Sequence, residues 1–309
     1  MRKQHDGWLS LSCKTFVSYW INVVRGLLLC VFFVALLFVG KGETQKVITQ
    51  PKDTPLVHIG VVPALTITET IKQYQPIVDY LNRRLNINAQ LMPRKDYVMV
   101  LEKMRNNEID AAIMGSFICY RAIKEIGAIP LVRPERPGIS TYEGVVFVRR
   151  DSGIKDIYGL KGKSFVYIDR NTSAGYVYPR FLLKEKGYNA DTFFKEGIFA
   201  GKHDAAVLMV LNKKADGGAA KDDVYFRIEK ENPRIKNEMK ILHLSSAKFP
   251  DRTIVIRKGF DSALSKKIKE ALITMNKDEE GRKALKEAGF DRYISTVIED
   301  FRGLEKMLR

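Results

Sequence analysis

Short β-branched runs alternate with stretches of helical periodicity from residue 56 to the end of the 309-residue chain. This alternation is typical of an α/β protein with mostly parallel sheets and helices on both faces. Strands are expected at 57–62, 89–92, 109–114, 145–149, 164–168, 215–219, 239–244 and 253–257. Helices are expected at 76–85, 97–106, 120–125, 174–186, 204–212, 262–275, 279–287 and 298–308.

Local signals indicate where several of these helices begin. Thr66 and Glu69 have the spacing of a capping box, which predicts a first helix directly after the first strand. Pro76 fits the first turn of a helix, so a second helix is expected to start there. Asp96 and Asp204 are predicted to be N-cap residues, because a short carboxylate accepts hydrogen bonds from first-turn N–H groups.

The pattern divides into two α/β units joined by extended crossovers, near 142–149 and near 250–257. We therefore expect two lobes, with 46–145 and 251–309 forming the first and 146–250 inserted as the second. A length of 309 residues agrees with about two domains. Clefts between domains are common binding sites for small ligands.

The N-terminal segment 1–45 contains 13 consecutive apolar residues at 27–39, preceded by a net-positive stretch. A helix of that length reaches about 20 Å, short of the roughly 30 Å hydrocarbon core of a bilayer. The run therefore indicates a secretory signal that places the rest of the chain outside the cytoplasmic membrane. Because Gly40-Lys41-Gly42 is a poor cleavage site, an uncleaved membrane anchor stays open as an alternative.

The net charge of +16 favours anionic partners. Residues 1–45 contribute +3 of it, which leaves +13 on the remainder. A small oxyanion, nucleic acid and an anionic membrane face all fit such a charge, as does a merely solvated basic surface. Nucleic acid is not expected, because the basic residues are spread thinly and form no known recognition motif.

The loop 169–176 lies between a predicted strand and a predicted helix and is rich in hydroxyl groups. Hydroxyls and unpaired N–H groups at a helix start form an anion site. Thr172, Ser173, Ala174 and Gly175 are the candidates there. The alternative is that Thr172 or Ser173 only caps its own helix.

Five further residues are candidate ligand contacts. His203 opens a predicted helix and could donate to an anion, and Asp216 could accept from a ligand. Tyr97 and Tyr120 lie at predicted helix starts just after strands, where the ends of open α/β sheets form a ligand crevice. Thr66 is a candidate by the same argument, because it lies in the loop after the first predicted strand. Each of them could equally be a packing, turn or surface residue.

Signatures of catalysis are missing from the sequence. It contains no phosphate-binding loop, dinucleotide fingerprint or nucleophile elbow. Its four histidines are not at metal-ligand spacing, and Cys119 is the only cysteine beyond the first 30 residues. We therefore expect no metal, no cofactor and no enzyme activity, although an enzyme on a similar scaffold is a third alternative.

Several short motifs, taken in order between about 59 and 257, resemble the PhnD-like phosphate/phosphite/phosphonate-binding proteins of ABC importers. The motifs are Asp96-Tyr97, Asn107-Glu108-Ile109-Asp110-Ala111-Ala112, Gly115 with Tyr120, Tyr142-Glu143-Gly144, Arg150-Asp151-Ser152-Gly153-Ile154, Leu160-Lys161-Gly162-Lys163, Thr172-Ser173-Ala174-Gly175-Tyr176 with Pro179, His203-Asp204-Ala205-Ala206, and Ala215-Asp216.

This resemblance implies a type II periplasmic-binding fold with the ligand held between two lobes. It also implies that Thr172 and Ser173 bind the oxygens of the oxyanion and that His203 contacts it. Tyr97 and Tyr120 are expected to line the cleft. The sequence departs from the family pattern at Ala174, where a serine hydroxyl is lost, and at Ser116, where proline is common. Because this hydroxyl donor is lost, the sequence leaves open whether the ligand is a phosphonate or another oxyanion.

The leading interpretation is a monomeric periplasmic solute-binding protein that delivers a small anionic ligand to an ABC permease in the inner membrane. A membrane-anchored sensing domain on the same fold is the main alternative.

Overall fold

The computed structural model describes residues 54–61, 67–94 and 96–309. The apolar run at 27–39 and the candidate Thr66 lie outside the described residues. Within the described part of the chain, no helix is both long enough and apolar enough to cross a membrane.

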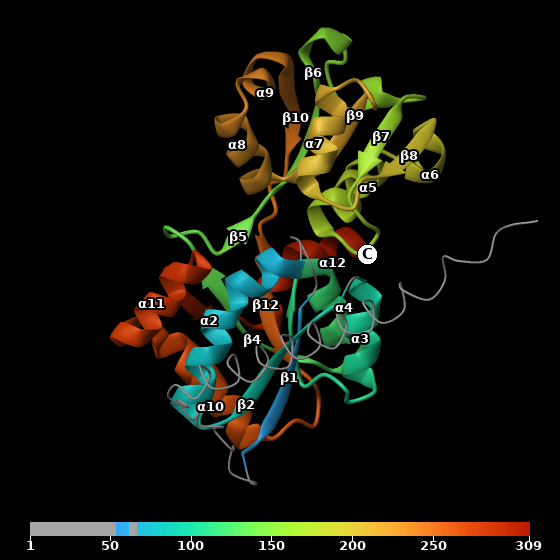
Figure 1. Ribbon diagram of the computed structural model, residues 1–309. Coiled ribbons are helices and arrows are strands. Elements are labelled where there is room, and N and C mark those ends of the chain that lie inside the picture. Colours follow the sequence, from blue (N-terminus) through green and yellow to red (C-terminus); the bar gives the residue numbers. More distant parts are fainter. Residues whose placement is uncertain (1–53, 62–66, 95) are drawn as a thin grey trace, which may run out of the picture. The chain divides into compact units, whose positions relative to one another are not determined.

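The first lobe is built on a six-stranded sheet (Figure 1). Its strands lie in the order β13 (Arg292–Ser295), β4 (Ile129–Glu135), β12 (Thr253–Ile256), β3 (Ala111–Met114), β1 (Leu56–Val61) and β2 (Asn88–Pro93). Its helices are α2 (Ile67–Leu85), α3 (Tyr97–Arg105), α4 (Ser116–Ile126), α10 (Ser262–Thr274) and α11 (Glu279–Ala288).

Helices cover both faces of this sheet, and β3 shows how. Ala111 and Ile113 pack with the apolar side chains of α2, α10 and α11. Ala112 and Met114 point to the other face and pack with α3 and α4. A strand buried on both faces needs a continuous apolar sequence, and Ala-Ala-Ile-Met provides it.

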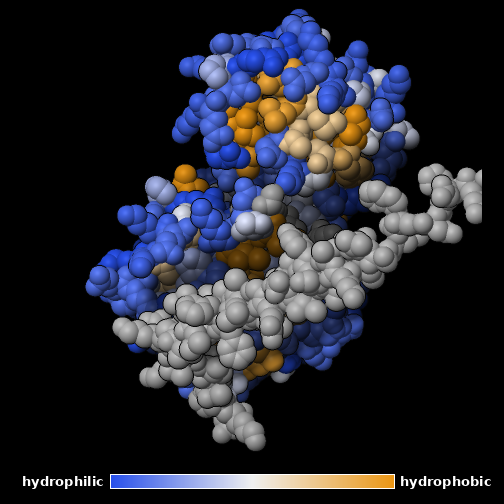
Figure 2. Space-filling view, in the orientation of Figure 1, coloured by the Kyte–Doolittle hydropathy of each residue, from blue (hydrophilic) through white to orange (hydrophobic). Residues whose placement is uncertain are grey.

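The second lobe is built on a five-stranded sheet. Its strands lie in the order β10 (Met239–Leu244), β6 (Gly144–Arg149), β9 (Gly217–Lys221), β7 (Ser164–Tyr167) and β8 (Glu196–Phe199). Its helices are α5 (Tyr178–Lys184), α6 (Ala190–Phe193), α7 (His203–Leu211), α8 (Asp222–Glu231) and α9 (Pro233–Glu238). Hydrophilic side chains cover most of the coloured surface in Figure 2, with apolar areas on both lobes, including a broad one on this lobe.

The chain passes between the lobes twice, and the two passages pair with each other. β5 (Thr141–Tyr142) and β11 (Phe249–Pro250) form a short antiparallel ribbon. The chain enters the second lobe after β5 and leaves it before β11. The last helix, α12 (Arg302–Leu308), packs with the second lobe through Leu304 and Met307. The sequence assigns all of 251–309 to the first lobe, so this helix differs from that expectation.

Both sheets are mixed, whereas the alternation of elements predicts mostly parallel sheets. β1 is parallel to β2 and β3, and β7 is parallel to β8 and β9. Four of the five antiparallel pairings in these two sheets involve β6 or β12, the strands that follow the crossovers, and the fifth joins β13 to β4. β12 returns from the second lobe with Thr253 beside Met114, the last residue of β3, so it runs in the opposite direction.

The structure tests three sequence predictions about helix starts, at Pro76, Asp204 and Asp96. The first two are wrong and the third is confirmed. Pro76 lies inside α2 rather than at the start of a second helix, because residues on both sides of it, such as Tyr74 and Ile77, are buried in one core. Asp204 is in the first turn of α7, and Lys202 occupies the cap position. The prediction for Asp96 is confirmed, since its carboxylate accepts from the N–H of Val98.

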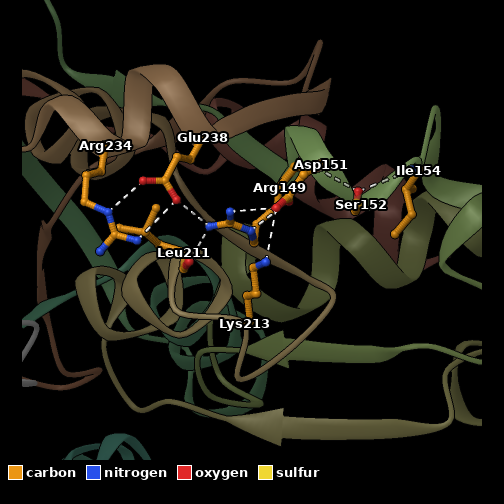
Figure 3. A network of polar contacts seen from close by, with 8 residues as sticks. All are labelled: Arg149, Asp151, Ser152, Ile154, Leu211, Lys213, Arg234 and Glu238. Carbon is orange, nitrogen blue, oxygen red and sulfur yellow. Dashed lines mark hydrogen bonds and ion pairs between the residues drawn. The ribbon is translucent and has the colours of Figure 1, made fainter.

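Short helical turns complete the chain at η1 (Arg150–Ser152), η2 (Ile157–Leu160), η3 (Ser173–Val177), η4 (Met275–Lys277) and η5 (Ile298–Phe301). Near η1, the guanidinium of Arg149 connects three elements of the second lobe (Figure 3). It pairs with both oxygens of Asp151, with Glu238 at 2.8 Å, and with the carbonyl oxygen of Leu211 at 2.6 Å. Its side chain is only 12% exposed.

We expect Arg149→Met to lower the free energy of unfolding by about 2 kcal/mol, because the change leaves the Leu211 carbonyl and two carboxylates without their buried partner. Chemical denaturation at neutral pH measures it. Arg234→Met is the matched control, since Arg234 binds the same Glu238 from a half-exposed position. Equal losses for the two variants would contradict the assignment of Arg149 as the connecting residue.

Candidate functional site

A pocket lies where both lobes and both crossovers meet. Gln73 and Ser116 line it from the first lobe, and Ser173 and Lys221 line it from the second. The volume of this pocket is about 50 Å³. That space holds about four water-sized groups, the size of a small tetrahedral oxyanion.

The topology brings strand ends and helix starts to this point. β3 and β9 reach the pocket at their carboxyl ends, and the loop that follows the carboxyl end of β7 also lines it, as expected for open α/β sheets. The first residues of four helical segments line the pocket: Tyr97, Ser116, Ser173 and His203. Since first-turn N–H groups are unpaired and carry partial positive charge, the pocket is built for an anion.

Two buried cations add to this positive potential. Lys221, the last residue of β9, and Arg252, beside the return crossover, both line the pocket. The ammonium of Lys221 lies 2.6 Å from the Asp251 carboxylate and 3.8 Å from the centre of the Tyr142 ring. Burial opposes the charge on Lys221, but Asp251 raises its pKa above the ordinary value, so it stays charged. One carboxylate facing two cations leaves the group net positive.

His203 is held as a neutral hydrogen-bond donor. The backbone N–H of Lys221 donates to its Nδ1 at 3.1 Å, so Nδ1 is the acceptor nitrogen and the proton belongs on Nε2. Burial and the positive charge of Lys221 lower the pKa of His203 to about 3. The ring therefore offers its Nε2–H to a ligand at neutral pH without changing charge.

Some hydroxyl groups of the pocket make hydrogen bonds within the protein, and one does not. Ser116 donates to the Pro250 carbonyl oxygen at 2.5 Å and accepts from Tyr142 at 2.8 Å, since a carbonyl only accepts. Thr172 donates to the Asp169 carbonyl oxygen. Ser173 is different, because its Oγ is buried and has no hydrogen-bond partner among the described residues. A buried hydroxyl without a partner is costly unless a ligand satisfies it.

The structure brings five of the nine sequence candidates together. Tyr97, Thr172, Ser173, Ala174 and His203 all line the pocket. Burial and the nearby Asp169 raise the pKa of Tyr97 to about 12, so it remains a neutral hydroxyl.

Three candidates lie elsewhere. Gly175 packs its backbone on the end of β7, where an added Cβ would come within 2.2 Å of Ile168. Tyr120 packs its ring against Phe301, with 6.4 Å between ring centres. Asp216 precedes β9, at the opposite end of that strand from the pocket, and its carboxylate accepts from Ser164.

The sequence reasoning missed Lys221, Arg252 and Tyr142 as pocket residues. Lys221 could have been found, since it ends the strand that Asp216 precedes and only carboxyl ends face the crevice. Arg252 and Tyr142 belong to the crossovers, which carry no local signal for a binding role. No cluster of three or more candidate metal ligands is present among the described residues.

Comparison with known proteins identifies the family. The family of periplasmic substrate-binding proteins of phosphonate ABC transporters matches residues 59–301. The chain belongs to this family. The phosphonates-binding periplasmic protein of Escherichia coli is 23% identical over 239 residues, which cover 76% of this chain and 70% of the relative. The phosphate-import protein PhnD of Mycolicibacterium smegmatis is 27% identical over 180 residues, which cover 54% of this chain and 55% of the relative.

The fold has close counterparts among solved structures. PhnD1 from Prochlorococcus marinus, in complex with methylphosphonate, has a TM-score of 0.69 and 19% identity, with 82% of this chain and 96% of that chain covered. This likeness shows that the chain has the two-lobed fold of type II periplasmic binding proteins.

The ligand-free protein should lose stability in acid through His203. Its folded pKa of about 3 lies below the ordinary 6.5, so only the unfolded chain takes up a proton as the pH falls between these values. The free energy of unfolding should fall by up to about 1.4 kcal/mol per pH unit in that window and be unaffected above it. Denaturation at pH 7.5 and 4.5 measures the loss.

His203→Gln removes this titration, so the variant should lose less stability than the wild type between the two pH values. Ser245→Ala is the control and should keep the wild-type dependence, because the Ser245 hydroxyl does not titrate and bonds the Ala247 carbonyl oxygen outside the pocket. If His203→Gln and the wild type fall in parallel, His203 is not buried as a neutral ring.

Proposed function

We propose that the protein is the periplasmic solute-binding component of an ABC importer, and that its lobes close on a small oxyanion of the phosphonate, phosphite or phosphate class. The observation that carries this proposal is the pocket between the lobes, where Lys221, Arg252 and four helix starts face one small space. The relatives named above bind phosphonates or import phosphate, and the names of all three describe binding or import, not catalysis.

The crossovers support closure by a hinge. The two strands β5 and β11 pair only with each other, so the connection between the large sheets is narrow. Hinges of this kind absorb backbone rotation while the lobes move as bodies. Contacts across the cleft are present, because Arg121 of α4 donates to the Asn171 side chain at 2.8 Å. A ligand that satisfies donors from both lobes stabilises the closed arrangement.

Isothermal titration with methylphosphonate, phosphite and phosphate tests the function, and Ser173→Ala tests the site. The variant should bind about 10- to 100-fold more weakly, because a hydrogen bond to a charged oxygen contributes about 1.5–3 kcal/mol. Its unfolding free energy without ligand should be unchanged or higher, since the lost hydroxyl has no partner among the described residues. No binding of any of these anions by folded protein would overturn the function.

Ser245→Ala is the matched control, because Ser245 is another buried serine but donates to the Ala247 carbonyl oxygen. It should lose about 1 kcal/mol of stability and keep its affinity, the reverse of Ser173→Ala. Equal affinity losses in the two variants would argue against a ligand contact at Ser173.

We also propose that the apolar run at 27–39 is a cleaved export signal, which releases the protein to the periplasm. N-terminal sequencing of protein recovered from the periplasm should then start after residue 39. A membrane-bound protein that retains the run would instead support the anchored sensing domain.

A further inference from the structure

We propose that the pocket selects the fully deprotonated form of its oxyanion, so that it takes a dianion and rejects the protonated monoanion of the same compound. This inference rests on the proposed function, because it specifies the charge state of the ligand at that site. It follows from the types of hydrogen-bonding group that face the pocket.

The charged side chains that line the pocket are cations, and its amide oxygens are occupied. Gln73 accepts from the guanidinium of Arg252 at 2.5 Å. Asn171 accepts from Arg121 at 2.8 Å, and its NH₂ donates to Asp169. Three groups of the pocket can donate to a ligand: the Ser173 hydroxyl, the Nε2–H of His203 and the Nε–H of Arg252. The hydroxyls of Thr70 and Tyr97 also line the pocket, and like that of Ser173 they are neutral groups that can donate or accept.

The carboxylates near the pocket accept hydrogen bonds from other groups of the protein. Asp251 accepts from Lys221 at 2.6 Å, and Asp169 accepts from the N–H and the side chain of Asn171. Neither carboxylate lines the pocket. A protonated oxyanion carries a P–OH donor, which then has no charged acceptor among the described pocket residues. The dianion has only acceptors and matches the donors.

The charge of the protein side of the pocket is constant between about pH 5 and pH 9. Burial and Lys221 lower the pKa of His203 to about 3. Burial opposes ionisation of Asp251, yet Lys221 and Arg252 lower its pKa to about 2. Burial opposes the charge on Arg252, but Tyr74 and Asp251 raise its pKa above the ordinary value. Any pH dependence of binding in this range therefore belongs to the ligand.

Tyr97 and Tyr142 also stay neutral in this range. Burial and Asp169 raise the pKa of Tyr97 to about 12, and burial raises the pKa of Tyr142. Lys221 stays charged because Asp251 raises its pKa.

Isothermal titration of the full chain with methylphosphonate between pH 5.5 and 8.5, at constant ionic strength, tests the inference. Affinity should rise by about tenfold per pH unit below the second pKa of the ligand and become constant above it. Methanesulfonate has nearly the same shape but carries one charge at every pH. It should bind at least about 30-fold more weakly than the methylphosphonate dianion, with no pH dependence.

Affinity for methylphosphonate that is flat with pH, or that falls as the pH rises, would overturn the inference, as would methanesulfonate binding as tightly as the dianion. In His203→Gln the binding should be weaker but the pH slope should persist, and loss of the slope would assign it to the protein instead. These outcomes are distinct from failure of the proposed function, in which methylphosphonate, phosphite and phosphate bind at no pH.

Discussion

The buried ion pair between Lys221 and Asp251 is the interaction on which the binding site depends. Lys221 ends a strand of the second lobe, and Asp251 lies on the segment by which the chain returns to the first. Both side chains are nearly buried, at 13% and 12% exposure. Removing two charges from water costs several kcal/mol each, and the attraction between them offsets that cost only with good geometry. The pair thus connects the lobes at the hinge and keeps a cation beside the pocket.

Arg252 shows a second constraint at the same place. Its backbone has φ of 30°, in the left-handed region that non-glycine residues rarely adopt. Such strain persists when surrounding contacts fix the conformation. Here Asp251 donates its N–H to the Ser140 carbonyl oxygen, while the Arg252 guanidinium binds Gln73 and Tyr74. The strained turn points one carboxylate toward Lys221 and the next side chain toward α2. A single crossover segment therefore supplies both the counter-charge and the second cation.

Much of the architecture could be predicted from the sequence, because it depends on local patterns. Apolar runs such as that of β3 specify buried strands, and the N-cap at Asp96 needs only a carboxylate before a helix. The loop at Thr172 and Ser173 could be chosen as a candidate because hydroxyls at a strand–helix junction suit either an anion or a helix cap, and both residues line the pocket. Asp110 in the resembling motifs has a structural role, as its carboxylate binds the N–H of His58 and the Arg257 guanidinium.

Lys221 was within reach of the sequence, because it ends the strand that Asp216 precedes and the carboxyl ends of strands face the crevice. The rest of the site could not be predicted, because it depends on contacts between residues distant in sequence. Tyr142 and Arg252 meet only after the two crossovers pair.

The same geometry explains how an anion site tolerates alanine at position 174. The Ala174 methyl group lines the pocket and is 1% exposed, so no hydroxyl donates from that position. At the proposed anion site, the backbone N–H groups that open η3 do not depend on the side chain at position 174. Ser173, His203 and Arg252 line the same pocket and carry further donors. An apolar methyl on one wall and donors on the others suit an oxyanion that carries one substituent unable to accept a hydrogen bond, and they suit it best when its remaining oxygens are deprotonated.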